Sequence, residues 1–210
     1  MKTALVTGST QGIGKQVGID LLKAGYHVIF NYGHNDEGAK ELEKEISLFS
    51  KNFSIIKNDF STEENIYKFV SDVKQIINHL DVLVLNASIT NKNNIEDLTF
   101  SEWNDVIMTN LTAPFFLVKS FKNLIKTNGN IIFIGAILGL FPHAISIPYG
   151  VSKAAIHMLA KSLVKEFCEN KIRVNVIAPG FVDTPWQKNK APDHRKRIED
   201  KIALHRFATV

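Results

Sequence analysis

The chain has 210 residues, of which 45% are apolar and 22% are charged, and its formal net charge is +4. This length favours a single domain with a substantial core, and the composition is that of a soluble globular protein. One cysteine, Cys168, excludes an intramolecular disulfide framework and fits a reducing compartment. The N-terminus turns polar too early for a secretory signal, and the longest apolar run, residues 131–141, is far below the roughly 20 residues of a membrane helix. We therefore expect a cytoplasmic protein that makes no use of a membrane.

The excess positive charge lies in one segment. Residues 188–206 hold seven Lys and Arg against three Asp and Glu, whereas residues 1–187 are balanced. A basic helix can mark a nucleic-acid-binding surface. A solvated face, or a rim that attracts an anionic substrate, accounts for this segment better, and we expect no nucleic-acid partner.

Short β-branched runs alternate with helical patterns along the chain. The runs predict strands at residues 3–7, 27–32, 53–57, 82–86, 130–134 and 173–178. The helical patterns cover residues 14–24, 37–50, 62–80, 101–125 and 149–170. We expect Thr62 and Ser101 to be N-caps, because acidic residues follow them in the first helical turn. We expect Gly25 to end the helix that runs to Ala24. Apolar strands alternating with helices predict an α/β fold: one doubly wound Rossmann domain over residues 1–210, with a mostly parallel sheet flanked by helices.

A glycine-rich turn follows the first predicted strand. The sequence "VTGSTQGIG" places Gly8, Gly12 and Gly14 directly before a helix. Glycine permits a tight turn and lets backbone amides approach a pyrophosphate at the positive end of the helix. Because this turn joins a strand to a helix within a βαβ unit, it predicts a dinucleotide-binding site.

Tyr149 and Lys153 stand four residues apart near the start of the last long predicted helix, so they share one helix face. A tyrosine with a pKa of about 10 is a poor proton donor or acceptor near neutrality. We expect the adjacent ammonium to favour the phenolate and to lower the pKa of Tyr149.

Six motifs occur in register along the chain: "TGSTQGIG", "NDF" at residues 58–60, "LNAS" at 85–88, Asn110, "YGVSK" and "NVIAPGFVDT". In order and spacing they resemble the short-chain dehydrogenase/reductase family, and most closely its 3-oxoacyl-acyl-carrier-protein reductases. The resemblance runs from Lys2 to about Arg206.

The resemblance implies an oxidoreductase that reduces a carbonyl, in a 3-oxoacyl thioester or similar ketone, to an alcohol. Tyr149 would protonate the carbonyl oxygen while the nicotinamide delivers a hydride, Lys153 would hold the nicotinamide ribose, and Asn110 would support a water-linked proton path. The implied cofactor-binding residues are Gly8, Ser9, Gln11, Gly12, Ile13, Gly14, Tyr32, Asp59, Phe60, Asn86, Ala87, Ser88, Tyr149, Lys153, Pro179, Gly180, Val182 and Thr184.

The end of the second strand favours NADP(H), with NAD(H) as the alternative. Tyr32 stands where an acidic residue would bind the 2′-hydroxyl of NAD. Few residues favour a 2′-phosphate directly, because Gln11 replaces the family's basic residue and only His34 and Asn35 follow Tyr32 closely. By resemblance, Asp59 would bind the adenine amino group, with Phe60 supplying backbone.

Ala136 departs from the family, which places there a serine that binds the substrate oxygen. Losing one such donor typically costs about 10²–10³ in rate. Ser88 replaces a glycine of the family motif, as in its pteridine-reductase branch, and Ser146 is a further candidate donor. Two alternatives therefore stay open: a pteridine-reductase-like enzyme, and a dinucleotide-binding protein with weak or no catalysis.

Other expectations concern partners. The family's carrier-protein reductases hold acyl carrier protein with basic residues, but the matching positions are Thr127 and Asn170, although Lys126 and Lys171 are adjacent. By resemblance, residues 188–206 are a substrate lid, here called the lid segment, and the protein is a homo-tetramer or dimer. Family members continue with a further helix and a seventh strand, so we expect an incomplete chain.

The histidines His143, His157, His194 and His205 show no ligand spacing, so no metal site is predicted.

Overall fold

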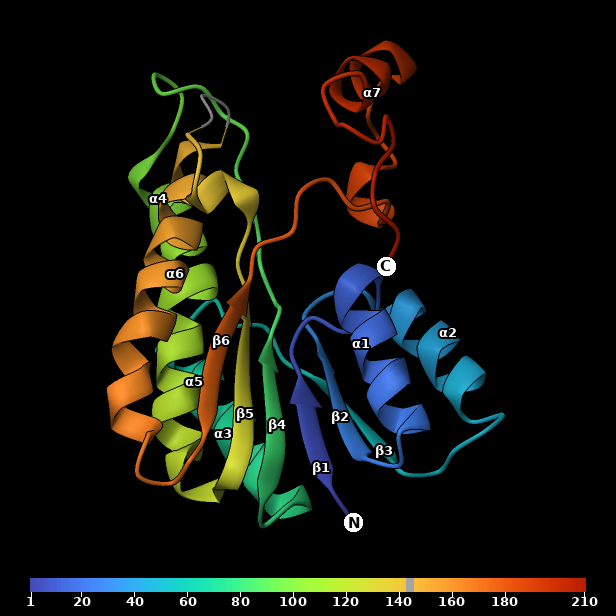
Figure 1. Cartoon of the computed structure of the whole chain (residues 1–210), viewed down its shortest axis with the longest axis vertical. Coiled ribbons are helices and arrows are strands. Elements are labelled where there is room, and N and C mark those ends of the chain that lie inside the picture. Colours follow the sequence, from blue (N-terminus) through green and yellow to red (C-terminus); the bar gives the residue numbers. More distant parts are fainter. Residues whose placement is uncertain (143–145) are drawn as a thin grey trace.

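Six parallel strands form the central sheet, in the order β3-β2-β1-β4-β5-β6 (Figure 1). They are β1 (Thr3–Val6), β2 (His27–Tyr32), β3 (Phe53–Lys57), β4 (Leu80–Leu85), β5 (Ile125–Ile134) and β6 (Arg173–Ile177). This computed structural model describes residues 1–142 and 146–210. The order reverses between β1 and β4, and ligands of such sheets bind beyond the carboxyl ends of the strands at this switch point.

Helices cover both faces of the sheet, as the sequence predicts. On one face lie α1 (Gly12–Lys23) and α2 (Asp36–Ile46), and on the other lie α3 (Glu63–Ile76), α5 (Ala113–Phe121) and α6 (Ile147–Phe167). Successive residues of β1 enter different cores: Leu5 packs with the α3, α5 and α6 side, whereas Ala4 and Val6 pack with the α1 and α2 side. Because both faces of β1 are covered, Ala4, Leu5 and Val6 are apolar in succession.

Two of the three expected helix ends are confirmed. The Thr62 side chain accepts a hydrogen bond from the Asn65 N–H (3.1 Å), and Gly25 follows α1 with a φ of +84°. The expectation for Ser101 is wrong, because the N-cap of α4 (Phe100–Ile107) is Thr99. Thr99 and Glu102 form a reciprocal capping box, which satisfies two N–H groups at once.

The helix predicted over residues 101–125 is divided. After α4, a turn of π-helix spans Met108–Thr112, and α5 ends at Phe121 before a short 3₁₀ turn, Lys122–Leu124, leads into β5. Pro114 lacks the N–H that would bond the carbonyl of Asn110, which accounts for the widened turn at this place.

The chain after β6 rises beyond the carboxyl ends of the strands and carries α7 (Pro192–Glu199) (Figure 1). It folds back on itself: the rings of Phe181 and Phe207 stack with centroids 5.2 Å apart, and Val182 pairs with Ala208 in an isolated parallel bridge. The lid segment therefore lies over the edge of the sheet where the switch point opens. Among the described helices, none is long and apolar enough to cross a bilayer.

Candidate active site

A cavity of about 1970 Å³ opens at the carboxyl ends of the strands. It brings together most of the residues predicted from the sequence, from Gly8 in the first turn to Thr184 after β6. The predicted residues that line it are Gly8, Gln11, Gly12, Ile13, Tyr32, Asp59, Phe60, Asn86, Ala87, Ser88, Tyr149, Lys153, Pro179, Gly180, Val182 and Thr184. Three predicted residues, Ser9, Gly14 and Asn110, lie behind this lining instead.

The backbone of the first turn requires glycine residues. Gly8 and Gly12 have φ values of +61° and +55°, a region that disfavours side chains. A Cβ atom at Gly8 would also approach the Cα of Ala87 to 2.8 Å. Gly14 packs directly against the Asn86 side chain, where a Cβ would clash. The first N–H groups of α1, which have no intrahelical partners, are therefore accessible at the cavity and suited to an anion.

Buried polar side chains hold this turn in place. The Ser9 hydroxyl donates to the carbonyl of Val6 (2.8 Å), so Ser9 locks the turn from behind. The Asn86 side chain donates to the carbonyls of Thr7 (3.0 Å) and Gly8 (2.8 Å). The Thr7 hydroxyl accepts from the N–H groups of Asn86 and Ala87, both at 3.0 Å. Sequence analysis missed Thr7, whose signal is its place directly after β1.

At the other end of the cavity, Tyr32 ends β2. Its hydroxyl donates to Asp36 (3.0 Å), and Lys57 forms an ion pair with the same carboxylate (2.7 Å). The hydrogen bond from Lys57 holds the pKa of Asp36 below its ordinary value, so this carboxylate is ionised and its charge is balanced.

Asp59 lies after β3 in the same part of the cavity. Burial alone would raise the pKa of Asp59, but hydrogen bonds from Ser61 and Asn65 bring it below its ordinary value. Asp59 is thus a carboxylate that can accept a further hydrogen bond.

Lys153 is buried on α6, with 3% of its surface exposed. Its ammonium donates to the carbonyl of Ile134 at the end of β5 (2.7 Å) and lies 5.5 Å from the ring centroid of Tyr149. Burial lowers the pKa of Lys153 to about 8.

Burial raises the pKa of Tyr149, contrary to the lowering expected from the sequence. The cause of this rise in pKa is desolvation, which disfavours the charged phenolate. The phenol is therefore protonated near neutrality and is poised to give a proton.

Ala136, where the resemblance expects a serine, is buried and lines the cavity. Its N–H donates to His157 (3.4 Å), and burial, followed by the charges of Lys153 and Lys161, lowers the pKa of this histidine. His157 is thus a neutral acceptor that holds the backbone at residue 136.

The two serines proposed as replacement donors differ. The Ser146 hydroxyl is already hydrogen-bonded to Thr90. The Ser88 hydroxyl is buried and has no partner among the residues that the structure describes. A buried polar group without a partner is costly, so Ser88 is the one suited to receive a ligand.

Asn110 lies in the π-helical turn and is 1% exposed. Its side chain accepts from the Ile89 N–H (2.8 Å), and donates to the Ile89 carbonyl (2.9 Å) and to Ser152 (3.1 Å). Asn110 thus clamps the segment after β4 to α6. Its implied part in a proton path stays a prediction.

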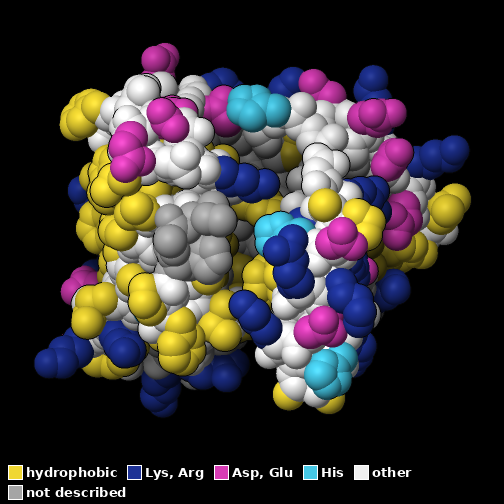
Figure 2. Space-filling view, turned by 90° about the horizontal axis from the view of Figure 1, so that it is seen from above, with side chains coloured by type: hydrophobic (Ala, Val, Ile, Leu, Met, Phe, Trp, Pro, Cys, Tyr) yellow, Lys and Arg dark blue, Asp and Glu magenta, His cyan; other side chains and the backbone are white. Residues whose placement is uncertain are grey.

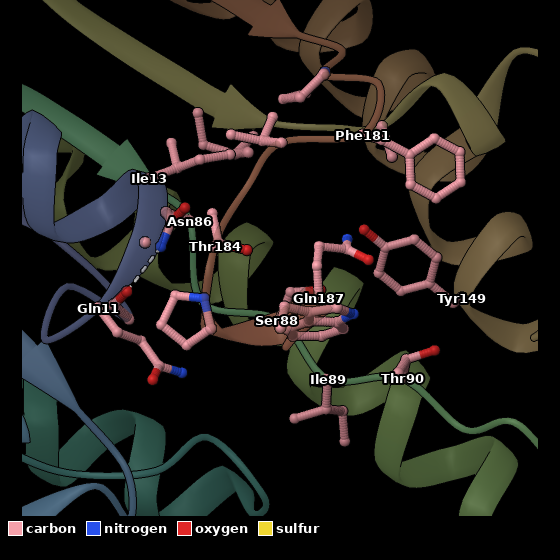
Figure 3. A pocket seen from close by; sticks show the side chains of 18 of the residues that line it. Gln11, Ile13, Asn86, Ser88, Ile89, Thr90, Tyr149, Phe181, Thr184 and Gln187 are labelled. Carbon is pink, nitrogen blue, oxygen red and sulfur yellow. Dashed lines mark hydrogen bonds between the residues drawn. The ribbon is translucent and has the colours of Figure 1, made fainter. Parts of the chain in front are cut away.

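Sequence analysis also missed two residues beside Tyr149. Trp186 lies with its ring centroid 6.4 Å from that of Tyr149, and Tyr149 points toward Gln187 (Figure 3). The Oε1 atom of Gln187 is buried and has no hydrogen-bond partner within the described parts of the chain. Their only signal in the sequence is that they follow Thr184 closely.

No group of three or more His, Cys, Asp or Glu side chains that could hold a metal ion occurs within residues 1–142 and 146–210. His143 lies outside the described residues.

Comparisons with known proteins agree on the family. A sequence model of the short chain dehydrogenases matches residues 2–195. An uncharacterized oxidoreductase of Bacillus subtilis, YmfI, is 31% identical over 99% of this chain and 86% of its own length. The 3-oxoacyl-acyl-carrier-protein reductase FabG of Buchnera aphidicola is 33% identical over 99% of this chain and 84% of its own. Among solved structures, the NADP complex of Pseudomonas aeruginosa RhlG superimposes with a TM-score of 0.90 at 27% identity, covering 99% of this chain and 84% of that one. With its glycine-lined cavity and its Tyr149–Lys153 pair, the chain belongs to the short-chain dehydrogenase family of NAD(P)-dependent oxidoreductases.

Proposed function

We propose that the protein is an NADP(H)-dependent reductase that converts the carbonyl of a 3-oxoacyl thioester, or a similar ketone, to an alcohol. One observation carries the proposal: a protonated tyrosine and a buried lysine meet in the cavity that the first-turn glycines line. The relatives named FabG support the substrate class.

The residues of the cavity fit a dinucleotide. At Gly8 a Cβ atom would fill the space beside the turn, and the N-terminus of α1 faces the place where a pyrophosphate would lie. We assign the pyrophosphate to this turn, the adenosine to the part of the cavity near Tyr32 and Asp59, and the nicotinamide to the part near Ser88, Tyr149 and Lys153.

In the reduction, the phenol of Tyr149 gives its proton to the carbonyl oxygen. A bound NADPH would supply the hydride for the carbonyl carbon. Lys153 would hold a hydroxyl of its ribose and, as a cation, would stabilise the phenolate that Tyr149 becomes. Ser88 donates a hydrogen bond to the substrate oxygen, in the role that a serine at position 136 has in the family.

The preference for NADP(H) is supported by the end of β2. Tyr32 places no charge where the 2′-phosphate would lie, and Lys57 balances the charge of Asp36 nearby. The RhlG structure, which contains NADP, supports the same choice.

Further partners follow from the relatives. We propose that an acyl carrier protein can present the substrate, which would place the protein in fatty acid biosynthesis, and that the protein is a homo-tetramer or dimer. Exposed apolar side chains on α6, among them Val151, Met158 and Val164, favour self-association.

A second candidate is a dinucleotide-binding protein with weak or no catalysis. Ala136 favours it, because the hydroxyl that the family places there is missing. A pteridine-reductase-like activity is the third, and Ser88 favours it.

One experiment separates these candidates. NADPH oxidation is measured against a panel of 3-oxoacyl thioesters, simple ketones and pterins, with Tyr149→Phe as the matched variant. The proposal expects turnover of thioesters or ketones that Tyr149→Phe nearly abolishes. Turnover of pterins alone would support the pteridine-reductase reading, and tight NADPH binding without any turnover would support the non-catalytic one.

A further inference from the structure

The cavity has a strongly basic lining on the side of the lid segment. Five Lys and Arg side chains and one His line it there and on the loop after β4, namely Lys92, Lys190, His194, Arg197, Lys201 and Arg206. Figure 2 looks down on this end of the molecule and shows Lys, Arg and His side chains gathered around the hollow. Of the acidic residues in the described chain, Asp59 and Asp105 alone line the cavity.

The cations of the lid segment divide into two groups. Arg195 forms ion pairs with Asp183 (3.0 Å) and Glu199 (2.9 Å), and Lys196 pairs with Asp200 (3.1 Å). Neither Arg195 nor Lys196 lines the cavity. Lys190 does line it and has no ion pair within the described residues. Nearby carboxylates therefore pair with the outward cations Arg195 and Lys196, whereas Lys190 is left unpaired in the described chain.

Lys190 and Lys92 reach the cavity from different segments. Lys92 lies two residues after Thr90, whose hydroxyl bonds to Ser146, three residues before Tyr149. Lys190 lies three residues after Gln187, toward which Tyr149 points (Figure 3). Both lysines thus line the same cavity as Tyr149 and reach it from different parts of the chain.

The two lysines line the same cavity, so their charges bear on each other. Burial, and then the charge of Lys92, lower the pKa of Lys190, whose Nζ lies 5.7 Å from the ring centroid of Phe181. Lys92 likewise has no carboxylate at ion-pair distance in the described parts of the chain. Two like charges across a cavity repel each other, and an anion between them removes that cost.

We propose that Lys92 and Lys190 bind an anionic group, a phosphate or a carboxylate, carried by the carbonyl substrate at a distance from its reacting carbon. This subsite rests on the proposed function and names the class of substrate: an anionic carbonyl compound. It is separate from the phosphates of the cofactor, which are assigned to the first turn of α1 and to the region of Tyr32.

The test uses two matched pairs of substrates. Acetoacetyl-CoA and acetoacetyl-N-acetylcysteamine share the reacting group, but only the first carries phosphates. In the second pair, 5-oxohexanoate carries a carboxylate, and its methyl ester is neutral. The rates are measured with saturating NADPH. In the pair that matches the natural anion, we expect the KM of the anionic member to be about three- to ten-fold lower than that of the neutral member. The KM of the anionic member should rise with ionic strength. The pair that shows the difference identifies the source of the charge.

Four variants locate the subsite. Lys92→Met and Lys190→Met remove one charge each and keep an apolar stem, and each should bring the two KM values of the sensitive pair together, whereas Lys190→Arg should keep them apart. Lys188→Met removes a charge from the same segment at a position that does not line the cavity, so the ratio of KM values should stay as in the parent. Equal KM values in both pairs, or an equal effect of Lys188→Met, would overturn the proposal.

Failure of the proposed function gives a different result. If no member of either pair is reduced, binding of acetoacetyl-CoA and 5-oxohexanoate to the protein saturated with NADP⁺ is measured by calorimetry. Binding that Lys92→Met and Lys190→Met weaken, and Lys188→Met does not, would keep the anion subsite without the reductase. Binding of neither compound would overturn the subsite as well.

Discussion

Ala136 and Ser88 both line the cavity, and we expect them to decide how the substrate oxygen is held. The family's hydroxyl at position 136 is missing, and the Ser88 hydroxyl is buried without a partner in the described structure. Because an unpartnered buried hydroxyl is unfavourable, a ligand oxygen that accepts from Ser88 would gain a full hydrogen bond.

The first prediction follows from this exchange of donors. We expect Ser88→Ala to lower kcat by about 10²-fold, as loss of one oxyanion donor does, and Ala136→Ser to add little to the parent. The double variant with Ser88→Ala and Ala136→Ser should regain most of the rate. A large gain in Ala136→Ser, together with an unchanged kcat in Ser88→Ala, would contradict the assignment.

The second prediction concerns pH. Burial lowers the pKa of Lys153 to about 8, so Lys153 is charged below that pH and neutral above it. We expect kcat/KM for carbonyl reduction to fall as the pH rises through about 8, because the phenolate then loses its cation. Unfolding temperatures over the same pH range separate titration from unfolding, and a flat profile from about pH 7 to 9.5 would contradict the assigned role of Lys153.

At the scale of elements, the turn before α1 was predicted closely because its glycines have a backbone reason. Gly8 and Gly12 have positive φ values, which few residues other than glycine adopt. The spacing of the two glycines can therefore be recognised in a single sequence. The single helix expected over residues 101–125 was not predicted correctly. Its division depends on Pro114 and on the place where β5 pairs with β4. The N-cap fell on Thr99 rather than Ser101 because only Thr99 has a Glu three residues later.

The third prediction is that Gly12→Val abolishes NADPH binding. Valine disfavours the φ of +55°, and a Cβ atom there would lie 3.2 Å from the Cγ2 of Thr184. Gly25→Val is the matched control: its φ is +84°, and nothing lies within 4 Å of its Cβ. Calorimetry should show normal NADPH binding for Gly25→Val despite a loss of stability of about 1–2 kcal/mol. NADPH binding by Gly12→Val as tight as in the parent would mean that the cofactor site is misplaced.

The fourth prediction concerns the end of β2. The parent should bind NADPH more tightly than NADH, and Tyr32→Asp should reverse that order, with a change of at least about ten-fold in the ratio of the two Kd values. Tyr32→Phe, which removes only the hydrogen bond to Asp36, should keep the preference for NADPH. A parent that binds NADH more tightly would refute the assignment of NADP(H).

At the scale of the whole molecule, the cavity joins segments that the sequence keeps far apart. The residues at the strand ends were predicted from motifs, but Trp186, Gln187 and the Lys92–Lys190 pair were not. The positions of Trp186, Gln187 and Lys190 depend on how the chain after β6 folds back through contacts of Phe181, Phe207 and Arg195, which no local sequence pattern predicts. The basic excess of the lid segment was visible in the sequence, whereas its division into paired and unpaired charges needed the structure.

The most direct test of the central claim follows the hydride and the proton together. With NADPH deuterated at the transferred position of the nicotinamide, the alcohol formed from a reduced thioester or ketone should carry one deuterium, measured by mass spectrometry, and Tyr149→Phe should form almost none of it while still binding NADPH. An alcohol without deuterium, or equal turnover in Tyr149→Phe, would contradict the account.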